Sequence, residues 1–276
     1  MPKSYPARLH VLLARDASTA VVIRRGPSKK VAVIGWDRET DEFTVGQWMK
    51  GRIYERRCDV SPDGKHFIYF AMNGHWDSET QGAWTAVSRA PYLKALTLIP
   101  QGDCWLGGGT FLSSSEYWFN RGYQYSLLRD ESGLSCNLEY PWPERYGYEC
   151  TSVYYPRLLR DGWLLQHREP TGAGDRIALF EKNIDEQWTI HKIAHQTNHN
   201  LKGKGCYFDE HMLRNRHTQV AVECPSWEWA EVDGDRLVWA EYGKLFSGRL
   251  DANGLIDVKE LLDFNTLQYE ELEAPY

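Results

Sequence analysis

The sequence predicts an all-β fold that is built from several similar four-stranded sheets. The chain has 276 residues, of which 42% are hydrophobic and 13% are aromatic, which is enough apolar material for a large core. Short runs rich in Val, Ile, Leu, Trp, Tyr and Phe recur along its whole length, whereas apolar residues at helical spacing are scarce. Turn-forming residues separate these runs. Together these observations favour strands joined by tight turns.

The first 50 residues give the clearest example of one sheet. We expect four strands there, at Leu9–Ala14, Ala20–Arg24, Val31–Trp36 and Phe43–Met49. Turn signals at residues 16–18, 26–28 and 37–41 separate them, so the four runs predict one antiparallel sheet.

A turn that opens an apolar strand returns four more times. The turns and strands are Ser61–Lys65 before His66–Ala71, Gln101–Asp103 before Cys104–Leu106, Arg160–Gly162 before Trp163–His167, and Asp233–Asp235 before Arg236–Ala240. The later units continue with strand pairs at Arg176–Lys182 and Gln187–Ile193, and at Lys244–Leu250 and Ile256–Leu262. Asp and Gly suit such turns because Asp bonds the backbone two residues on and Gly accepts positive φ. With the first sheet, this makes five copies of one element.

Five units in 276 residues average about 55 residues each, near the roughly 40–50 residues of known propeller blades. A blade cannot cover both of its faces alone, so blades stack side by side around an axis. The spacing therefore predicts a single five-bladed β-propeller domain over residues 1–276, with six blades or an irregular propeller as the alternative. Long insertions are expected near residues 107–150 and 194–217, and residues 263–276 form an acidic C-terminal tail, either a short helix or an extended strap.

One segment resembles a known family. Asp59-Val60-Ser61-Pro62-Asp63-Gly64-Lys65-His66-Phe67-Ile68-Tyr69-Phe70 is similar to the strand-turn-strand motif of TolB-type and related β-propellers. The resemblance covers one blade of the five, and the other units lack its Ser-Pro pair. It implies the propeller fold and says little about activity, because such repeats occur in scaffolds, hydrolases and receptors.

Charge and cysteine content restrict the expected binding partners and cellular location of the protein. The chain carries 38 acidic and 32 basic residues, a net charge of −6, which argues against a general nucleic-acid or anionic-membrane binder. No stretch reaches about 18 consecutive apolar residues, and no signal peptide is readable at the start. The six cysteines are far apart with no Cys-x-x-Cys pair, so we expect reduced thiols and a cytoplasmic protein.

Histidines cluster in one part of the sequence. His191, His195 and His199 are spaced four and four, which would place them on one face of a helix and make them weak candidates for a zinc site. The surrounding residues favour a strand end and a turn, and no His-Glu-x-x-His signature is present. We therefore expect no metal site and no cofactor.

Carboxylates define an alternative function. Some five-bladed propellers are glycoside hydrolases, in which two carboxyl groups face a sugar about 5–10 Å apart. The acidic residues near predicted inner strands are Glu55, Asp59, Glu228 and Glu231. They are the candidate catalytic groups of a carbohydrate-active hydrolase or lyase with an axial site.

Aromatic residues suggest a binding function. The chain has 12 Trp, 16 Tyr and 9 Phe, most of which we expect between blades. Residues 140–148 form the best candidate for an exposed patch, and the alternative is a satellite cluster that pins a long loop.

The favoured function is non-catalytic recognition of a macromolecular partner, expected to be a protein, as in a bacterial immunity or interaction protein. We expect no binding to nucleic acid or membranes, and carbohydrate is the alternative ligand. The candidate contact residues are His10, Arg57, His75, Trp76, Trp118, Arg121, Trp142, Arg145, His211 and Trp227.

Overall fold

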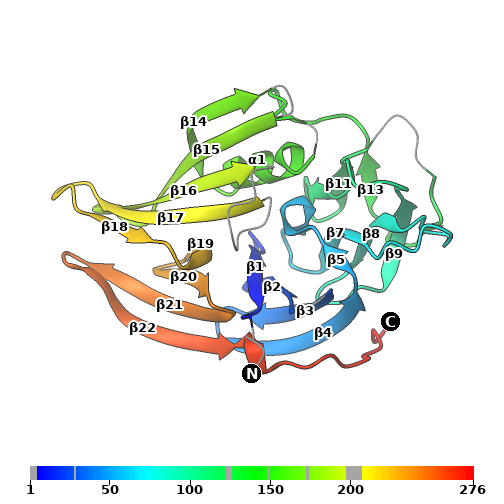
Figure 1. The fold of residues 1–276 in the computed structure, drawn as a ribbon, viewed down its shortest axis with the longest axis horizontal. Helices are drawn as coiled ribbons and strands as arrows, with labels where there is room; N and C mark the ends of the chain where they lie inside the picture. The colour runs from blue at the N-terminus through cyan, green and yellow to red at the C-terminus, as the bar shows by residue number, and fades with distance from the viewer. Residues whose placement is uncertain (1–4, 28, 122–125, 148, 172–173, 197–206) are drawn as a thin grey trace. The chain divides into compact units, whose positions relative to one another are not determined.

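The computed structural model describes residues 5–27, 29–121, 126–147, 149–171, 174–196 and 207–276. Nearly all of its regular elements are strands, and they form five sheets (Figure 1). The fold class is the one that the sequence predicts, an all-β, five-bladed β-propeller with one sheet per blade. None of the helices in these residues is long and apolar enough to cross a membrane.

The chain divides into two compact units. The first contains Tyr5, Val11–Arg157 and Gln268–Tyr276, with the first three sheets except the start of the first strand. The second contains Pro6–His10 and Leu158–Leu267, with the last two sheets.

The first sheet of the first unit has four antiparallel strands in chain order. They are β1 (Arg8–Leu13), β2 (Thr19–Arg25), β3 (Lys30–Asp37) and β4 (Glu42–Lys50). The four predicted strands are therefore confirmed. Val22, Ile23, Val33 and Ile34 are fully buried, because β2 and β3 are the central strands and both of their faces are covered.

The second sheet is larger than a standard blade. Its strands are β5 (Arg52–Ile53), β6 (Asp59–Val60), β7 (His66–Met72), β8 (Ala83–Arg89), β9 (Ala95–Pro100) and β12 (Arg129–Asp130). A shared core joins it to the first sheet through Leu12, Val21, Ile23, Val33, Phe67 and Tyr69.

The Ser61–Lys65 segment forms the predicted turn before β7. The Ser61 hydroxyl donates to the Asp63 carboxylate over 2.6 Å and accepts from the His66 amide over 2.9 Å. Gly64 has a φ of +72°, which favours glycine. The turn chemistry of the motif is thus formed as the residue types predict.

The third sheet is small, with β10 (Gly109–Phe111), β11 (Glu116–Phe119) and β13 (Ser135–Asn137), and β13 runs parallel to β11. The predicted strand at Cys104–Leu106 is wrong, because these residues form a bent loop between β9 and β10. A helix that the sequence did not suggest, α1 (Thr151–Arg160), follows the sheet and buries Val153, Tyr154 and Tyr155.

The fourth sheet, in the second unit, has five antiparallel strands in chain order. They are β14 (Leu164–Thr171), β15 (Gly174–Asn183), β16 (Trp188–Gln196), β17 (Tyr207–Asn215) and β18 (Ala221–Cys224). The insertion expected at 194–217 is smaller than predicted, since β16 and β17 pair through Gln196 and Tyr207. Residues 197–206 lie outside the described part of the chain.

The fifth sheet consists of β19 (Trp227–Asp233), β20 (Arg236–Glu241), β21 (Lys244–Asp251) and β22 (Gly254–Asp263). The pairing of β21 with β22 shifts register between Ser247 and Arg249, and Asp257 of β22 has a φ of +52°. The outer strand is therefore bulged. A short 3-10 helix, Phe264–Thr266, follows it.

Candidate functional site

An exposed tryptophan marks the candidate site, in the first unit. All 12 tryptophans lie in described residues, and only Trp76 and Trp105 are exposed, at 53% and 65%. Trp105 lies at the middle of residues 101–108, which we call the Trp105 loop and which connects β9 to β10. A single exposed apolar side chain is common on protein surfaces, so the site is identified by the contacts that hold the loop around Trp105.

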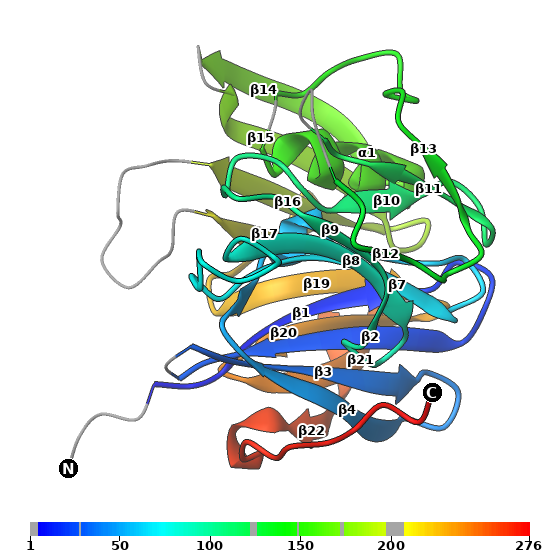
Figure 2. The same cartoon turned by 90° about the vertical axis from the view of Figure 1, so that its right-hand side faces the viewer.

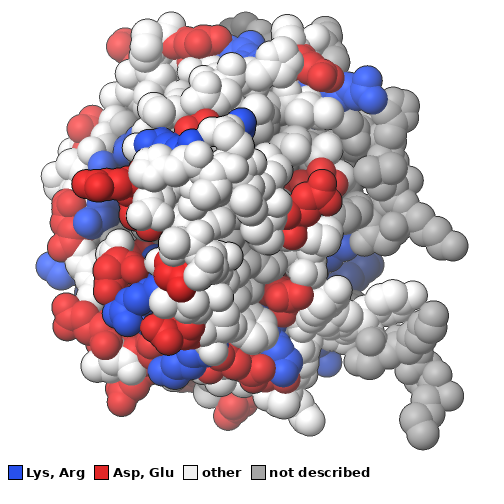
Figure 3. All heavy atoms as spheres, turned by 90° about the vertical axis from the view of Figure 1, so that its left-hand side faces the viewer, with Lys and Arg blue, Asp and Glu red and all other residues white. Residues whose placement is uncertain are grey.

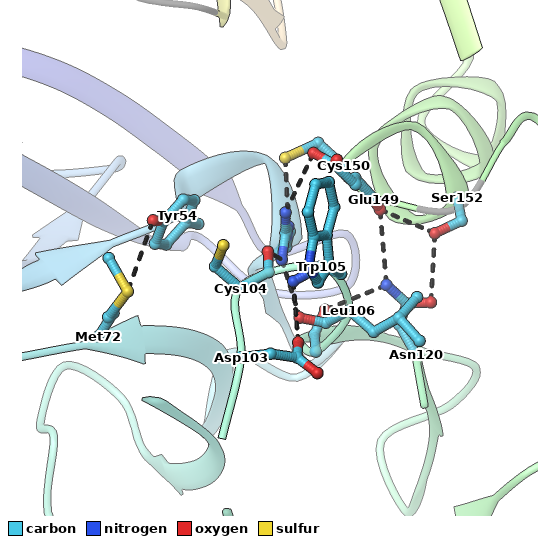
Figure 4. Close-up of polar contacts among 12 residues, drawn as sticks. Tyr54, Met72, Asp103, Cys104, Trp105, Leu106, Asn120, Glu149, Cys150 and Ser152 are labelled. Atoms are coloured by element: carbon cyan, nitrogen blue, oxygen red, sulfur yellow. Dashed lines mark hydrogen bonds and ion pairs between the residues drawn. The ribbon is translucent and has the colours of Figure 1, made fainter. Parts of the chain in front are cut away.

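A buried arginine holds the loop on both sides of Trp105. The Nη1 group of Arg57 donates to the carbonyl of Cys104 over 2.7 Å and to that of Leu106 over 2.8 Å. The Arg57 side chain is 1% exposed, at the end of a 3-10 helix formed by Glu55–Arg57. Figure 4 shows Cys104, Trp105 and Leu106 beside this network. Because guanidinium bonds to carbonyls are charge-assisted, they fix the backbone on either side of the indole.

Aromatic rings surround the same guanidinium. The Arg57 Cζ atom lies 5.1 Å from the ring centre of Tyr54 and 4.9 Å from that of Phe70. Burial raises the pKa of Tyr54, so its phenol stays protonated at neutral pH. The positive charge of Arg57 is thus stabilised by ring faces as well as by carbonyl oxygens.

A second part of the network connects Arg57 to the start of α1. Its Nε group donates to the Cys150 sulfur over 3.2 Å, and Nη2 lies 3.6 Å from the Glu149 carboxylate. The Ser152 hydroxyl oxygen lies 2.9 Å from the carbonyl oxygen of Glu149 and 3.2 Å from the Asn120 side-chain oxygen, so its one proton is shared between these two acceptors (Figure 4). The loop, the helix and β11 are therefore tied together by polar side chains that are mostly buried.

Two glycines allow the close approach of the loop to Arg57. Gly107 and Gly108 have φ values of +100° and +75°. A Cβ atom on Gly108 would lie 2.0 Å from the carbonyl oxygen of Arg57, and one on Gly107 would lie 2.4 Å from the Phe70 ring. Glycine is required at both positions because any side chain would push the loop away from the arginine.

The loop that carries Trp76 touches the Trp105 loop. Trp76 lies in residues 73–82 between β7 and β8, where a Cβ atom on Gly82 would come within 2.5 Å of its ring. A Cβ atom on Gly102 would lie 2.8 Å from the Gln81 side-chain oxygen. The two loops that bear the exposed tryptophans are therefore neighbours, and we call them together the tryptophan surface.

A second notable group, in the second unit, is a buried cluster of charges. It consists of Trp163, Lys182, Lys192, Asp209, His211 and Glu231, and we call it the Glu231 cluster. The Glu231 carboxylate lies 2.7 Å from the Lys182 ammonium and accepts a 2.8 Å hydrogen bond from the Trp163 indole. The Lys192 ammonium lies over the Trp163 ring at 4.3 Å. Two basic and two acidic groups thus balance one another; Lys192 and Asp209 are buried, and the side chains of Lys182 and Glu231 are 18% and 12% exposed.

The ionisation of Glu231 follows from these contacts. Burial alone would raise the pKa of Glu231, but the charges of Lys182 and Lys192 and the hydrogen bonds from Lys182 and Trp163 outweigh it and lower that pKa. The carboxylate is therefore held ionised, whereas a general acid needs a raised pKa.

His211 is the neutral member of the cluster. Burial and the nearby Lys192 charge lower the pKa of His211 to about 4. Its Nδ1 atom lies 3.1 Å from the carbonyl oxygen of Trp227, so Nδ1 carries the proton and Nε2 is left as an acceptor. Within the described residues Nε2 is buried and has no hydrogen-bond partner.

The other three candidate carboxylates are engaged in structural contacts. Glu55 forms a 2.7 Å ion pair with Arg25, and the buried Asp59 accepts a 2.8 Å hydrogen bond from the Phe111 amide. Glu228 accepts a hydrogen bond from the Leu9 amide over 3.0 Å. These contacts give each carboxylate a structural reason for its position.

The structure separates the candidate contact residues by burial. The side chains of His10, Arg57, Trp118, His211 and Trp227 are buried; Arg121 and Trp142 are half-buried; His75, Trp76 and Arg145 are exposed. In this structure the first five are not part of any surface that a partner could contact. Of the whole set, His75 and Trp76 lie on the tryptophan surface.

The Tyr140–Trp142 region packs as a satellite cluster. Trp118 of β11 lies edge-to-face against Tyr140 at 5.3 Å and against Trp142 at 5.1 Å. Arg145 lies over the Tyr140 ring at 4.6 Å. The half-buried rings thus hold the loop after β13 against the third sheet, so this arrangement corresponds to the alternative interpretation of the segment.

The histidine series does not lie on a helix. His191 and His195 lie on strand β16, and His199 lies outside the described residues. His195 lies 3.3 Å from Glu210 and stacks on Phe208 at 4.3 Å. In the described residues no group of three or more His, Cys, Asp or Glu side chains is placed to hold a metal ion.

Sequence reasoning missed Trp105, Lys182, Lys192 and the network at Cys150. A signal for Trp105 was present, since Gly-Asp-Cys-Trp-Leu-Gly-Gly-Gly has glycine on both sides of the tryptophan and favours a loop over a strand. The lysines gave no signal, because they occur on strands whose inward direction depends on register.

Charged side chains of both signs are interspersed on the face drawn in Figure 3. The excess of acidic residues is therefore not gathered into one continuous area on that face.

Comparisons with known proteins give a distant similarity. No family model matches the sequence, and no curated protein matches it. Among solved structures, the GH43 BlXynB protein from Bacillus licheniformis is similar with a TM-score of 0.32 and 10% sequence identity. The match covers 99% of this chain and 60% of that one, so this chain spans about three fifths of the length of that protein.

Proposed function

We propose that this protein is a non-catalytic recognition module that binds a protein partner through the tryptophan surface. The observation that carries the proposal is Trp105, which is 65% exposed while buried Arg57 holds the carbonyls on both sides of it. Tryptophan is enriched among residues that dominate binding energy at interfaces.

Preorganisation supports this function. A flexible loop would lose conformational entropy on binding, which weakens affinity. The Trp105 loop is already ordered by Arg57, by the 2.9 Å hydrogen bond from the Trp105 amide to Asp103, and by the glycine contacts. A partner therefore meets an indole on an ordered backbone, and the entropy cost of ordering the loop has already been met when the protein folds.

A protein partner fits this surface better than a sugar does. Sugar recognition needs polar side chains that converge beside a stacked ring and offer free hydrogen bonds. Around Trp105, the Asp103 carboxylate and the carbonyls of Cys104 and Leu106 already accept hydrogen bonds from the protein. Exposed polar side chains of residues 73–82 lie around the two indoles, and an aromatic centre with a polar rim is typical of protein interfaces.

The alternative function is a carbohydrate-active hydrolase or lyase that uses the candidate carboxylates. Glu231 would be its central group, since it is only 12% exposed and lies beside Trp163 and two lysines. Its lowered pKa suits a stabilising carboxylate and opposes a role as general acid. We favour recognition for this reason.

The test is affinity capture from a native lysate with purified wild-type protein and a Trp76→Ala/Trp105→Ala variant. Both side chains are exposed, so the variant should fold as the wild type does. The matched control is Tyr242→Ala, which removes an aromatic ring that is 63% exposed in the second unit. We expect one or more proteins to be captured by wild type and control and lost with the double variant. Capture that is equal for all three proteins, or a glycan that binds the wild type and depends on Glu231, would contradict the proposal.

A further inference from the structure

The C-terminal segment Gln268–Tyr276 belongs to the first unit although it follows the last sheet in sequence. It runs in extended form beside β4, the outer strand of the first sheet (Figures 1 and 2). We call it the tail. Its sequence, Gln-Tyr-Glu-Glu-Leu-Glu-Ala-Pro-Tyr, contains three glutamates and no basic residue.

Two tyrosines seven residues apart anchor the tail. The Tyr269 ring lies against Trp48 at 5.9 Å, with the Lys30 and Lys50 ammonium groups 5.4 and 5.1 Å from its centre. The centre of the Tyr276 ring lies 4.8 Å from the Arg89 Cζ atom and 5.2 Å from the Lys94 ammonium. Each tyrosine of the tail therefore contacts two basic side chains. Cation–π contacts of this kind are specific for an aromatic ring.

Hydrogen bonds fix the register of the tail between its anchors. The Gln47 amide donates to the Leu272 carbonyl over 2.9 Å and accepts from the Leu93 and Lys94 amides. The Tyr276 hydroxyl donates to the Lys94 carbonyl over 2.7 Å and accepts from the Arg89 amide over 3.1 Å. The receptor is thus formed by β4 and by the loop between β8 and β9.

Charge complementarity accompanies these contacts. The surface that receives the tail, the tail surface, consists of Lys30, Gln47, Trp48, Lys50, Arg89, Tyr92 and Lys94, four of which are basic. Tyr269, Leu272 and Tyr276 are half-buried against it, whereas Glu270, Glu271 and Glu273 are exposed. The glutamates therefore act on the basic surface through longer-range attraction, which salt screens.

We propose that the tail surface is a peptide-docking site for an extended, acidic protein segment with two tyrosines about seven residues apart, and that the tail occupies it as a built-in ligand. A partner segment of this chemistry displaces the tail. This site shares no residue with the tryptophan surface, so the two proposals stand or fall separately.

The test uses the full chain with Tyr269→Ala/Tyr276→Ala, in which the tail is present but has lost both anchors. A fluorescent peptide with the sequence of residues 267–276 is titrated against this variant and against the wild type, and circular dichroism checks that both are folded. We expect saturable binding to the variant and at least about tenfold weaker binding to the wild type, because the native tail competes. A peptide with alanine at both tyrosine positions should bind at least about tenfold more weakly.

Receptor-side changes identify the surface. Adding Lys50→Glu/Lys94→Glu to the variant should weaken binding at least about tenfold, whereas the matched control Lys259→Glu, on the exposed strand β22, should not. Binding should also weaken as NaCl rises from about 50 to about 500 mM. Absence of saturable binding, or binding that ignores the tyrosines or Lys50 and Lys94, would overturn the proposal. Should the double variant fail to fold, the same titration with Tyr276→Ala alone decides the question, because that change frees only the Arg89 and Lys94 half of the surface.

Discussion

Replacing Arg57 with methionine tests whether this side chain holds the Trp105 loop in place. Methionine preserves much of the buried volume but has no donor. The carbonyls of Cys104 and Leu106 would lose their 2.7 and 2.8 Å hydrogen bonds. Both carbonyls are partly buried, and a hydrogen bond from a charged donor contributes about 1.5–3 kcal/mol. Two such hydrogen bonds, together with the lost ring contacts, predict a loss of about 3–5 kcal/mol in the free energy of unfolding.

Arg129→Met is the matched control. The Arg129 Nη1 group also donates to a backbone carbonyl, that of Ala95 over 2.9 Å, but its side chain is 43% exposed. Water replaces an exposed hydrogen bond, so we expect a change below about 1 kcal/mol. Arg57→Lys should fall between the two, since one ammonium on a shorter side chain does not reproduce the fork of a guanidinium.

Urea unfolding followed by circular dichroism measures these differences at one fixed pH and salt concentration. Limited proteolysis gives a second readout, because a released Trp105 loop should be cut faster within residues 101–108. If Arg57→Met is no more destabilising than Arg129→Met, and the loop is cut no faster than in the wild type, Arg57 does not hold the loop.

Three further predictions concern backbone and charge. Gly108→Ala should destabilise the fold by at least about 2 kcal/mol, because the new Cβ atom would lie 2.0 Å from the Arg57 carbonyl oxygen. The effect is measured as a lower Tm, and an unchanged Tm would refute the close approach. Because of His211, the wild type should lose up to about 3 kcal/mol of stability as pH falls from 6.5 towards 4. In this range the unfolded chain takes up a proton on His211, whereas the folded chain does not, since its His211 has a pKa lowered to about 4. His211→Asn should flatten unfolding curves measured across that range, and an equal slope in both proteins would contradict the assignment. The pKa of Glu231 in the folded protein lies below its ordinary 4.5, so the stability that this carboxylate contributes is present above pH 4.5 and is lost as pH falls through the lowered value. Glu231→Gln should remove this acid-induced loss of stability in the same titration. It should also leave Lys182 without its carboxylate partner at neutral pH.

Much of the fold could be predicted from local sequence. The strands of the first sheet alternate with clear turn signals, and the Ser61–Lys65 turn is formed by side chains within five residues of one another. Such features need no knowledge of distant residues. The same holds for the hairpins of the fourth and fifth sheets, whose predicted strands are confirmed within a few residues.

Helix α1 could not be predicted in this way. Its sequence, Thr-Ser-Val-Tyr-Tyr-Pro-Arg-Leu-Leu-Arg, contains β-branched and aromatic residues and Pro156 inside the helix, all of which oppose a helix locally. Burial of Val153, Tyr154 and Tyr155 reverses this preference. The stabilising contacts come from residues distant in sequence, which periodicity does not reveal.

The candidate site was predictable only in part, because residue type does not determine exposure. Trp118 is 4% exposed and Trp105 is 65% exposed, yet both lie within short apolar runs, Tyr117–Phe119 and Cys104–Leu106. The difference comes from Arg57, 48 positions before Trp105, whose donors take the carbonyls that a strand would have paired. Arg57 is one of the contact residues expected from the sequence, but the structure buries its side chain beneath the Trp105 loop.

The bulged outer strand β22 affects how molecules of this protein behave at high concentration. Val258 is 55% exposed and Ile256 39%, on a ten-residue strand with one unpaired side within the described sheet. A straight strand of this kind is a template for fibril growth, because another chain can add to its free amide and carbonyl groups. The left-handed backbone at Asp257 and the register shift beside it interrupt that template, so another chain cannot extend the sheet regularly along this edge.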